Sequence, residues 1–197
     1  YYTYGGAYGD SNGHGTHTAG SIAGDGDFSE TANNSGAAAT GQFRGAAPAA
    51  ALVVTEILGS SPPSDDKVFA DQEAYGATVS SNSWGYVDGQ NNPITDYDTS
   101  AYLTDQSVID SNTSRSGLQP MTIVFAAGND GAGANTVGSP GTAKNIITVG
   151  ASESNRGYDG YADNASSVAS FSSRGPTDDR RARPDVVAVG TYILSAQ

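Results

Sequence analysis

Two histidines, His14 and His17, lie three positions apart in the segment GHGTHTAGSIAG (residues 13–24) and are the only histidines of the 197-residue chain. A zinc-binding helix of the H-E-x-x-H type needs histidines four positions apart with a glutamate between them, so the spacing argues against a metal site. His14 follows a glycine at a predicted helix start, where the helix dipole disfavours an imidazolium ion. A neutral histidine there can act as a general base, whereas His17 is expected to be structural.

A second candidate is Asn129, which follows the apolar run MTIVFAA (residues 121–127) and Gly128. A carboxamide at the carboxyl end of a strand can donate a hydrogen bond to an oxyanion that forms only in a transition state. Taken alone, the segment would be interpreted as a strand that leads into an Asn-Asp-Gly turn. Its meaning therefore depends on the motifs found elsewhere in the chain.

Those motifs form a set in fixed order. Five segments resemble the motifs of subtilisin-like serine peptidases, the subtilases. They are GHGTHTAG, SNSWG (81–85), FAAGNDG (125–131), FSSRGP (171–176) and RPDVVAVG (183–190). The resemblance covers residues 12–196 and is strongest to the bacterial oxidatively stable alkaline serine proteases. It implies that His14 is the general base of a catalytic triad and that Asn129 is the oxyanion amide. It also implies two strand segments that flank the substrate's P1 residue, formed by Ser83, Trp84 and Gly85 and by Ala126, Ala127 and Gly128.

Glycine in these strand segments has a physical reason of its own. Gly85 and Gly128 have no side chain, so a peptide backbone can approach closely and pair as an added strand.

The elements that position these residues alternate between strands and helices. Apolar runs predict four strands, at residues 51–58, 78–83, 121–127 and 146–149. Helices are predicted at residues 65–75 and 97–109. Helix caps are expected at Ser64 and Asp96, and Val68 shares a helix face with Tyr75, as Tyr102 does with Ile109. The order predicts an α/β fold with a mostly parallel, doubly wound sheet. The resemblance implies a subtilisin-like three-layer α/β/α arrangement, with residues 1–197 forming the central part of one peptidase catalytic domain.

The family's triad runs in the order Asp, His, Ser, and only the histidine has a counterpart here. Asp10 lies four residues before His14 and is expected to be a loop or cap carboxylate. Ser195 follows a strand-like run and lacks the Gly-Thr that precedes the family's nucleophile. The chain is therefore interpreted as a fragment that lacks N-terminal and C-terminal parts of the domain and has no activity by itself.

The composition of the chain limits the classes of molecule that it can bind and the chemistry that it can perform. The net charge of −12 disfavours nucleic acid and anionic membranes, and the absence of cysteine excludes a thiol nucleophile. We expect an extracellular, monomeric enzyme that acts on polypeptides and needs no cofactor for its chemistry. A structural calcium site and a solvated acidic loop fit one stretch equally well, namely Asp25, Gly26 and Asp27 with Glu30, Asn33 and Asn34 nearby.

The leading interpretation is a serine endopeptidase that forms an acyl-enzyme. The alternative is a catalytically inactive subtilase-fold domain, a pseudopeptidase with a binding or structural role, which the presence of both His14 and Asn129 disfavours. A dinucleotide-binding domain would need G-x-G-x-x-G after a strand, and only Gly131 and Gly133 fit that pattern.

Overall fold

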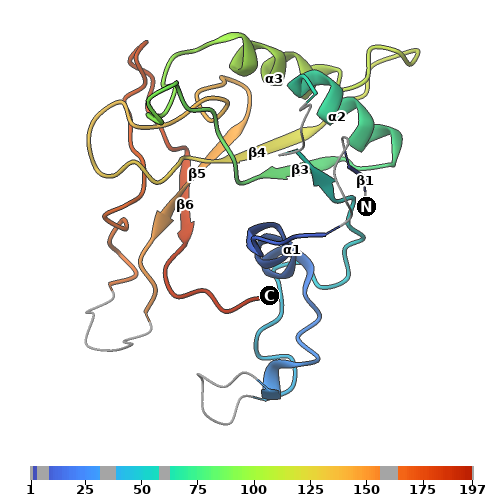
Figure 1. Ribbon diagram of the computed structural model, residues 1–197, viewed down its shortest axis with the longest axis vertical. Coiled ribbons are helices and arrows are strands. Elements are labelled where there is room, and N and C mark those ends of the chain that lie inside the picture. Colours follow the sequence, from blue (N-terminus) through green and yellow to red (C-terminus); the bar gives the residue numbers. More distant parts are fainter. Residues whose placement is uncertain (1, 4–8, 32–38, 58–62, 156–163, 197) are drawn as a thin grey trace. The chain divides into compact units, whose positions relative to one another are not determined.

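The computed structural model describes residues 2–3, 9–31, 39–57, 63–155 and 164–196 (Figure 1). The chain divides into two compact units, and each is described by itself. The first unit contains Tyr1–Pro62 and Ile193–Gln197, and the second contains Pro63–Tyr192. Of the predicted site residues, His14 belongs to the first unit and Asn129 to the second.

The first unit contains helix α1 (His14–Ala23), a short 3₁₀ helix η1 (Ser29–Thr31) and a parallel strand pair, β1 (Tyr2–Thr3) with β2 (Thr55–Glu56). The helix begins at His14, as the sequence predicts. Its last carbonyl groups are satisfied by the segment 45–47, whose amides donate to Gly24, Ser21 and Ile22. A helix end that is paired in this way needs no side-chain cap.

The second unit contains a parallel four-stranded sheet in the order β3-β4-β5-β6, which confirms the predicted α/β class. The strands are β3 (Val79–Asn82), β4 (Thr122–Ala126), β5 (Ile147–Ser152) and β6 (Val186–Val189). Helices α2 (Asp65–Ala74) and α3 (Thr99–Ile109) lie on one side of these strands (Figure 1). The strands predicted at 78–83, 121–127 and 146–149 and both predicted helices have similar bounds in the structure. Within the described residues, the strand predicted at 51–58 is only the two-residue β2, and β6 was not among the predicted strands.

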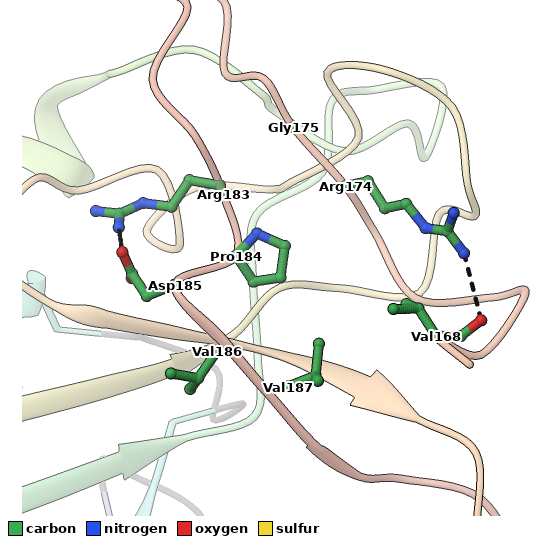
Figure 2. Close-up of a pocket in the computed structure, with 8 residues that line it drawn as sticks. All are labelled: Val168, Arg174, Gly175, Arg183, Pro184, Asp185, Val186 and Val187. Carbon is green, nitrogen blue, oxygen red and sulfur yellow. Dashed lines mark hydrogen bonds and ion pairs between the residues drawn. The ribbon is translucent and has the colours of Figure 1, made fainter. Parts of the chain in front are cut away.

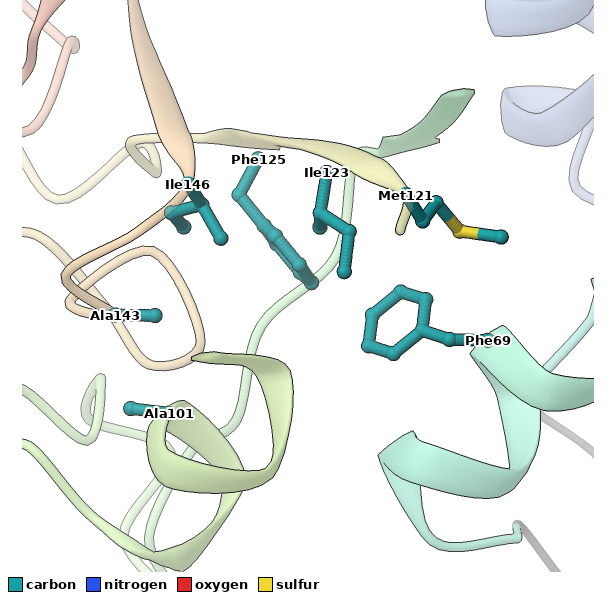
Figure 3. Close-up of a cluster of buried hydrophobic side chains, with 7 residues drawn as sticks. All are labelled: Phe69, Ala101, Met121, Ile123, Phe125, Ala143 and Ile146. Carbon is teal, nitrogen blue, oxygen red and sulfur yellow. The ribbon is translucent and has the colours of Figure 1, made fainter. Parts of the chain in front are cut away.

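A hydrophobic core joins α2 and α3 to the sheet (Figure 3). Ile123 and Phe125 alternate along β4 with exposed or half-buried residues and face Phe69 of α2, as the two-residue period of a strand requires. The complete cluster consists of Phe69, Ala101, Met121, Ile123, Phe125, Ala143 and Ile146. On the opposite face of the same sheet, Val79, Ile147 and Val186 are exposed. The architecture is that of an incomplete α/β domain.

The helix faces differ from the sequence expectation. Tyr75, Tyr102 and Ile109 are each more than half exposed, so the predicted apolar pairs do not mark the buried faces. The face that α3 buries carries small and polar residues, namely Ala101, Thr104, Asp105 and Ser107. Asp105 accepts the amides of Lys144 and Asn145, and the Ser107 hydroxyl donates to the Leu103 carbonyl of the same helix. The buried Thr104 hydroxyl has no hydrogen-bond partner among the described residues.

The cap of α3 also differs from the expectation. Asp98, and not Asp96, is the N-cap residue, and its carboxylate accepts a hydrogen bond from the Ala101 amide at 2.9 Å. The same carboxylate oxygen accepts the Ser139 hydroxyl at 2.5 Å. Asp98 stands directly before the first turn of α3, where a side-chain oxygen reaches the free amides of that turn.

Candidate active site

His14 is the first residue of α1, and its side chain is exposed. Among the residues that the structure describes, none forms a hydrogen bond with the His14 ring. The nearby Asp10 carboxylate instead accepts hydrogen bonds from the amide of Gly13 at 2.9 Å and from the amide and hydroxyl of Thr16 at 2.7 and 2.9 Å. These bonds, first of all the one from the Thr16 amide, lower the pKa of Asp10. Asp10 was expected to be a loop or cap carboxylate, and these bonds to the first turn of α1 match the cap alternative.

His17 is half-buried on the same helix and faces the C-terminal segment of the first unit. Its Nε2 lies 3.3 Å from the carbonyl oxygen of Ile193, and the Ser195 hydroxyl donates to the His17 carbonyl at 2.7 Å. Residues 193–196 form no helix or strand, and the strand that precedes Ser195 is β6, which ends at Val189. These contacts fit a structural role for His17 and give Ser195 a backbone partner.

Gly20 brings α1 into close contact with this C-terminal segment. A Cβ at position 20 would lie 2.5 Å from Ser195 Oγ and 2.9 Å from Ala196 Cβ. Alanine normally stabilises a helix relative to glycine by about 1 kcal/mol. We predict the opposite sign for Gly20→Ala, with a loss of about 1–2 kcal/mol because overpacking outweighs the gain in propensity. Thermal melting compares the stability of Gly20→Ala with that of Gly89→Ala. The second variant is the control, because a Cβ at Gly89 would meet open space. A higher melting temperature for Gly20→Ala contradicts the prediction.

The two predicted substrate segments leave the sheet side by side. Asn82 of β3 is paired with Phe125 of the parallel strand β4, so residues 83–85 and 126–128 continue from the same edge of the sheet. Ser83, Gly85 and Ala126 are exposed, whereas Ala127 is buried. Carboxyl ends of parallel strands are the usual place for ligands in α/β sheets.

Trp84 turns inward between these exposed neighbours. Its ring packs edge-on against Phe125 at a centroid distance of 5.0 Å, and its indole N–H donates to the Asn82 side chain at 3.2 Å. Asn82 is itself buried and donates to the carbonyl of Val124 at 3.1 Å. The Trp84 side chain therefore anchors the segment, whereas Ser83 and Gly85 are exposed and accessible to a ligand.

Asn129 follows directly after the second segment, and its side chain is exposed. Gly128 adopts a φ of +110°, a conformation that favours glycine, and so turns the chain sharply at the end of β4. Asn129 and residues 83–85 thus lie on segments that leave neighbouring strands at one edge of the sheet, and an exposed amide there can meet a ligand. His14 lies in the other unit.

A buried carboxylate supports the segment after Gly85. Tyr86 donates its hydroxyl to Asp65 at 2.8 Å, and Ser100 donates to the other oxygen of the same carboxylate. Asp65 is 3% exposed, and burial raises its pKa above the ordinary value of 3.8. The folded chain therefore holds the Asp65 proton more tightly than the unfolded chain, so this carboxylate makes the fold less stable as the pH rises from 3.8 through the raised pKa.

We predict that Asp65→Asn raises the melting temperature at pH 7 by about 2–4 °C and that the gain shrinks towards pH 4. The amide keeps hydrogen bonds to Tyr86 and Ser100 but removes the buried charge. Asp66→Asn is the matched control, because Asp66 lies in the same first turn of α2 and is exposed. A gain that grows as the pH falls, or an equal gain in both variants, would refute the assignment.

The candidate calcium loop is only partly described. The Asp25 carboxylate accepts the Asp27 amide at 3.0 Å, and Glu30 accepts the hydroxyl of Thr40. Within the described part of the chain, no group of three or more His, Asp or Glu side chains is placed to hold a metal ion. Asn33 and Asn34 lie outside the described residues.

A pocket of about 500 Å³ lies beside β6 (Figure 2). Arg183 points towards Asp185 on one side, and Arg174 points towards the carbonyl of Val168 on the other, so the two guanidinium groups face away from each other. The lining consists of Val168, Arg174, Gly175, Arg183, Pro184, Asp185, Val186 and Val187. It includes none of the predicted site residues, so we assign it no catalytic role.

Comparison with known proteins places the motifs in a family. The sequence model of the Subtilase family (peptidase S8) matches residues 1–197. The chain is 32% identical to serine protease AprX of Bacillus subtilis over 94% of its length and 39% of that protein. It is 30% identical to pyrolysin of Pyrococcus furiosus over 95% of its length and 15% of that protein.

Solved structures give the same result for the fold. Sphericase aligns with a TM-score of 0.57 and 27% identity over 95% of this chain and 55% of that chain. The S41 psychrophilic protease aligns with a TM-score of 0.60 and 26% identity over 94% and 55%. The chain thus spans little more than half the length of these structures and less of the curated relatives.

No helix in the described residues has the length and apolar character needed to cross a membrane.

Proposed function

The chain belongs to the subtilase family, and from this premise we propose that the protein is a serine endopeptidase that hydrolyses polypeptides through an acyl-enzyme. The observation that carries the proposal is the family match over residues 1–197. Two placements support it. His14 is exposed at the start of α1, and Asn129 is exposed at the carboxyl edge of the sheet beside residues 83–85.

In the proposed reaction, neutral His14 accepts the proton of a serine hydroxyl while the serine oxygen bonds to the substrate's carbonyl carbon. The carbonyl oxygen becomes negatively charged and receives a hydrogen bond from the Asn129 amide. His14 then gives its proton to the leaving amine, the peptide bond breaks, and water later hydrolyses the acyl-enzyme by the same proton transfers. Backbone groups of Ser83 to Gly85 and Ala126 to Gly128 hold the peptide as an added strand.

We further propose that residues 1–197 alone are inactive. The family's nucleophile lies in a Gly-Thr-Ser-Met-Ala-like segment, and this sequence contains no such segment. In the described residues, His14 has no carboxylate partner, because Asp10 caps the helix. The complete protein is proposed to be a secreted monomer whose chemistry requires no cofactor, and a structural calcium ion near Asp25 and Asp27 stays part of the proposal.

The test is pre-steady-state hydrolysis of a nitrophenyl ester by the protein expressed from its whole gene. We expect a burst of about one nitrophenol per enzyme, because the acyl-enzyme forms faster than it is hydrolysed, followed by cleavage of denatured casein at steady state. Residues 1–197 expressed alone give no burst. A folded whole protein that binds casein without hydrolysing it would instead support the inactive, pseudopeptidase reading.

A further inference from the structure

One buried serine fixes the backbone on both sides of Asn129. The amide of Ser173 donates to the carbonyl of Gly128 at 3.0 Å, and the Ser173 hydroxyl accepts the amide of Asp130 at 3.0 Å. We propose that Ser173 is a positioning residue, which holds the Asn129 amide where the oxyanion forms. The inference rests on the proposed peptidase function and adds a residue that acts through Asn129.

The packing around Ser173 leaves this loop little room to move. Ser173 is fully buried, and a Cβ at position 128 would lie 2.9 Å from its hydroxyl oxygen. Gly128 therefore contacts Ser173 closely while it holds the φ of +110° that turns the chain. The Asn129 side chain is exposed, and none of the described residues forms a hydrogen bond with it, so its direction depends on the backbone that Ser173 holds.

The rest of the segment after Phe171 strengthens the same contact. The carbonyl of Phe171 accepts the Gly131 amide at 2.9 Å. Farther along, Thr136 donates its amide to the Arg174 carbonyl at 2.9 Å and accepts the Arg174 amide on its hydroxyl at 2.8 Å. Residues 171–174 thus lie along the loop 128–136, and the hydroxyl of Ser173 is the side-chain group that reaches the residue next to Asn129.

The neighbouring Ser172 provides a matched control. It is as fully buried as Ser173, but its hydroxyl accepts the amide of Ala151 in β5 at 3.0 Å. Removing either hydroxyl leaves the backbone amide of one partly buried hydrogen bond without its partner, so we expect a comparable cost in stability. The Ser172 hydroxyl also donates a long hydrogen bond of 3.5 Å to the Ser173 carbonyl, but of the two hydroxyls only that of Ser173 bonds to the loop that carries Asn129.

We expect Ser173→Ala to lower kcat about 10- to 100-fold with KM changed less than about threefold, since a displacement of about 1 Å at a reacting group costs up to this much. The loss should not exceed that of Asn129→Ala, about 10²–10³-fold on the scale found for subtilisin. Ser172→Ala should lower kcat less than about threefold at a similar melting temperature. Should Ser173→Ala fail to fold, Ser173→Cys keeps a similar volume with a weak acceptor.

The experiment is a double-mutant cycle in the protein expressed from its whole gene, with kcat and KM measured for both single variants and for Ser173→Ala/Asn129→Ala. If Ser173 acts through Asn129, the double variant is no slower than Asn129→Ala alone. Losses that multiply, or a loss in Ser173→Ala no larger than in Ser172→Ala, would overturn the inference.

Failure of the proposed function has a different signature from failure of this inference. A wild-type protein without hydrolysis would remove the peptidase assignment and the inference with it. An active wild-type protein in which Asn129→Ala changes nothing would remove the oxyanion role of Asn129, and with it this inference, but not the peptidase assignment. Amide hydrogen exchange adds a readout that needs no activity. The Asp130 amide should exchange faster in Ser173→Ala and at the wild-type rate in Ser172→Ala, and equal exchange in all three proteins would also overturn the inference.

Discussion

Replacing His14 with alanine is expected to lower kcat of the protein expressed from its whole gene by about 10⁶-fold, with KM nearly unchanged. The magnitude is the one found for the catalytic histidine of subtilisin and is not calculated from this chain. The physical reason is that the serine hydroxyl loses its proton acceptor and the leaving amine loses its proton donor. Steady-state hydrolysis of a peptide nitroanilide gives both constants.

His17→Ala is the control for this variant, because it removes the other histidine of the chain from the same helix. His17 contacts the carbonyl of Ile193 at 3.3 Å, so its loss should lower the melting temperature and leave kcat within about threefold. Equal losses of kcat from the two substitutions, or a His14→Ala variant that keeps most of its activity, would contradict the assignment of His14 as the base.

Replacing Asn129 with alanine is expected to lower kcat by about 10²–10³-fold, again on the scale measured for subtilisin, with little change in KM. The hydrogen bond is made to an oxygen that becomes negative only in the transition state, so substrate binding does not depend on it. Asn129→Asp should be at least as slow, since a carboxylate of the same shape accepts hydrogen bonds but cannot donate one. Both constants come from the same nitroanilide assay.

Asp130→Ala tests whether the effect belongs to Asn129 and not to the loop in general. The Asp130 side chain is exposed, and the bond that holds this part of the loop comes from its backbone amide. We therefore expect kcat of Asp130→Ala within about threefold of the wild type. A large loss there, or an Asn129→Ala loss that falls on KM alone, would argue against an oxyanion contact.

Local sequence signals were sufficient for the strands and helices that surround the site. Runs of apolar residues predicted β3, β4 and β5, and the glycine before His14 marked the start of α1, because these patterns reflect backbone geometry and burial along one element. Asp10 could likewise be expected to act as a cap from its position alone. The segments 83–85 and 126–128 followed from the strands that precede them.

Features that depend on tertiary contacts could not be predicted in this way. The buried face of α3 carries Thr104 and Asp105, while Tyr102 and Ile109 are exposed, so apolar periodicity points to the wrong face. Asp105 is buried because its carboxylate accepts the amides of Lys144 and Asn145, which are far away in the sequence. The pattern of this helix reflects polar partners in distant segments, and these are not visible in a single stretch of sequence.

The role of Ser173 was missed for a related reason. Ser172 and Ser173 are adjacent and identical in type, and both are fully buried. Only the structure shows that one hydroxyl serves β5 and the other serves the loop of Asn129. The motif FSSRGP did mark the segment as part of the family pattern, but it gave no reason for either serine.

Labelling with a biotinylated fluorophosphonate tests the central claim most directly, because this reagent reacts with serines that a neighbouring base has activated. The protein expressed from its whole gene should carry one adduct, which peptide mass spectrometry locates on a serine outside residues 1–197, in a Gly-Thr-Ser-like segment. The adduct should be absent from the folded His14→Ala variant. A folded wild-type protein without an adduct, or labelling that persists in His14→Ala, would contradict the account of His14 as the base of a serine peptidase.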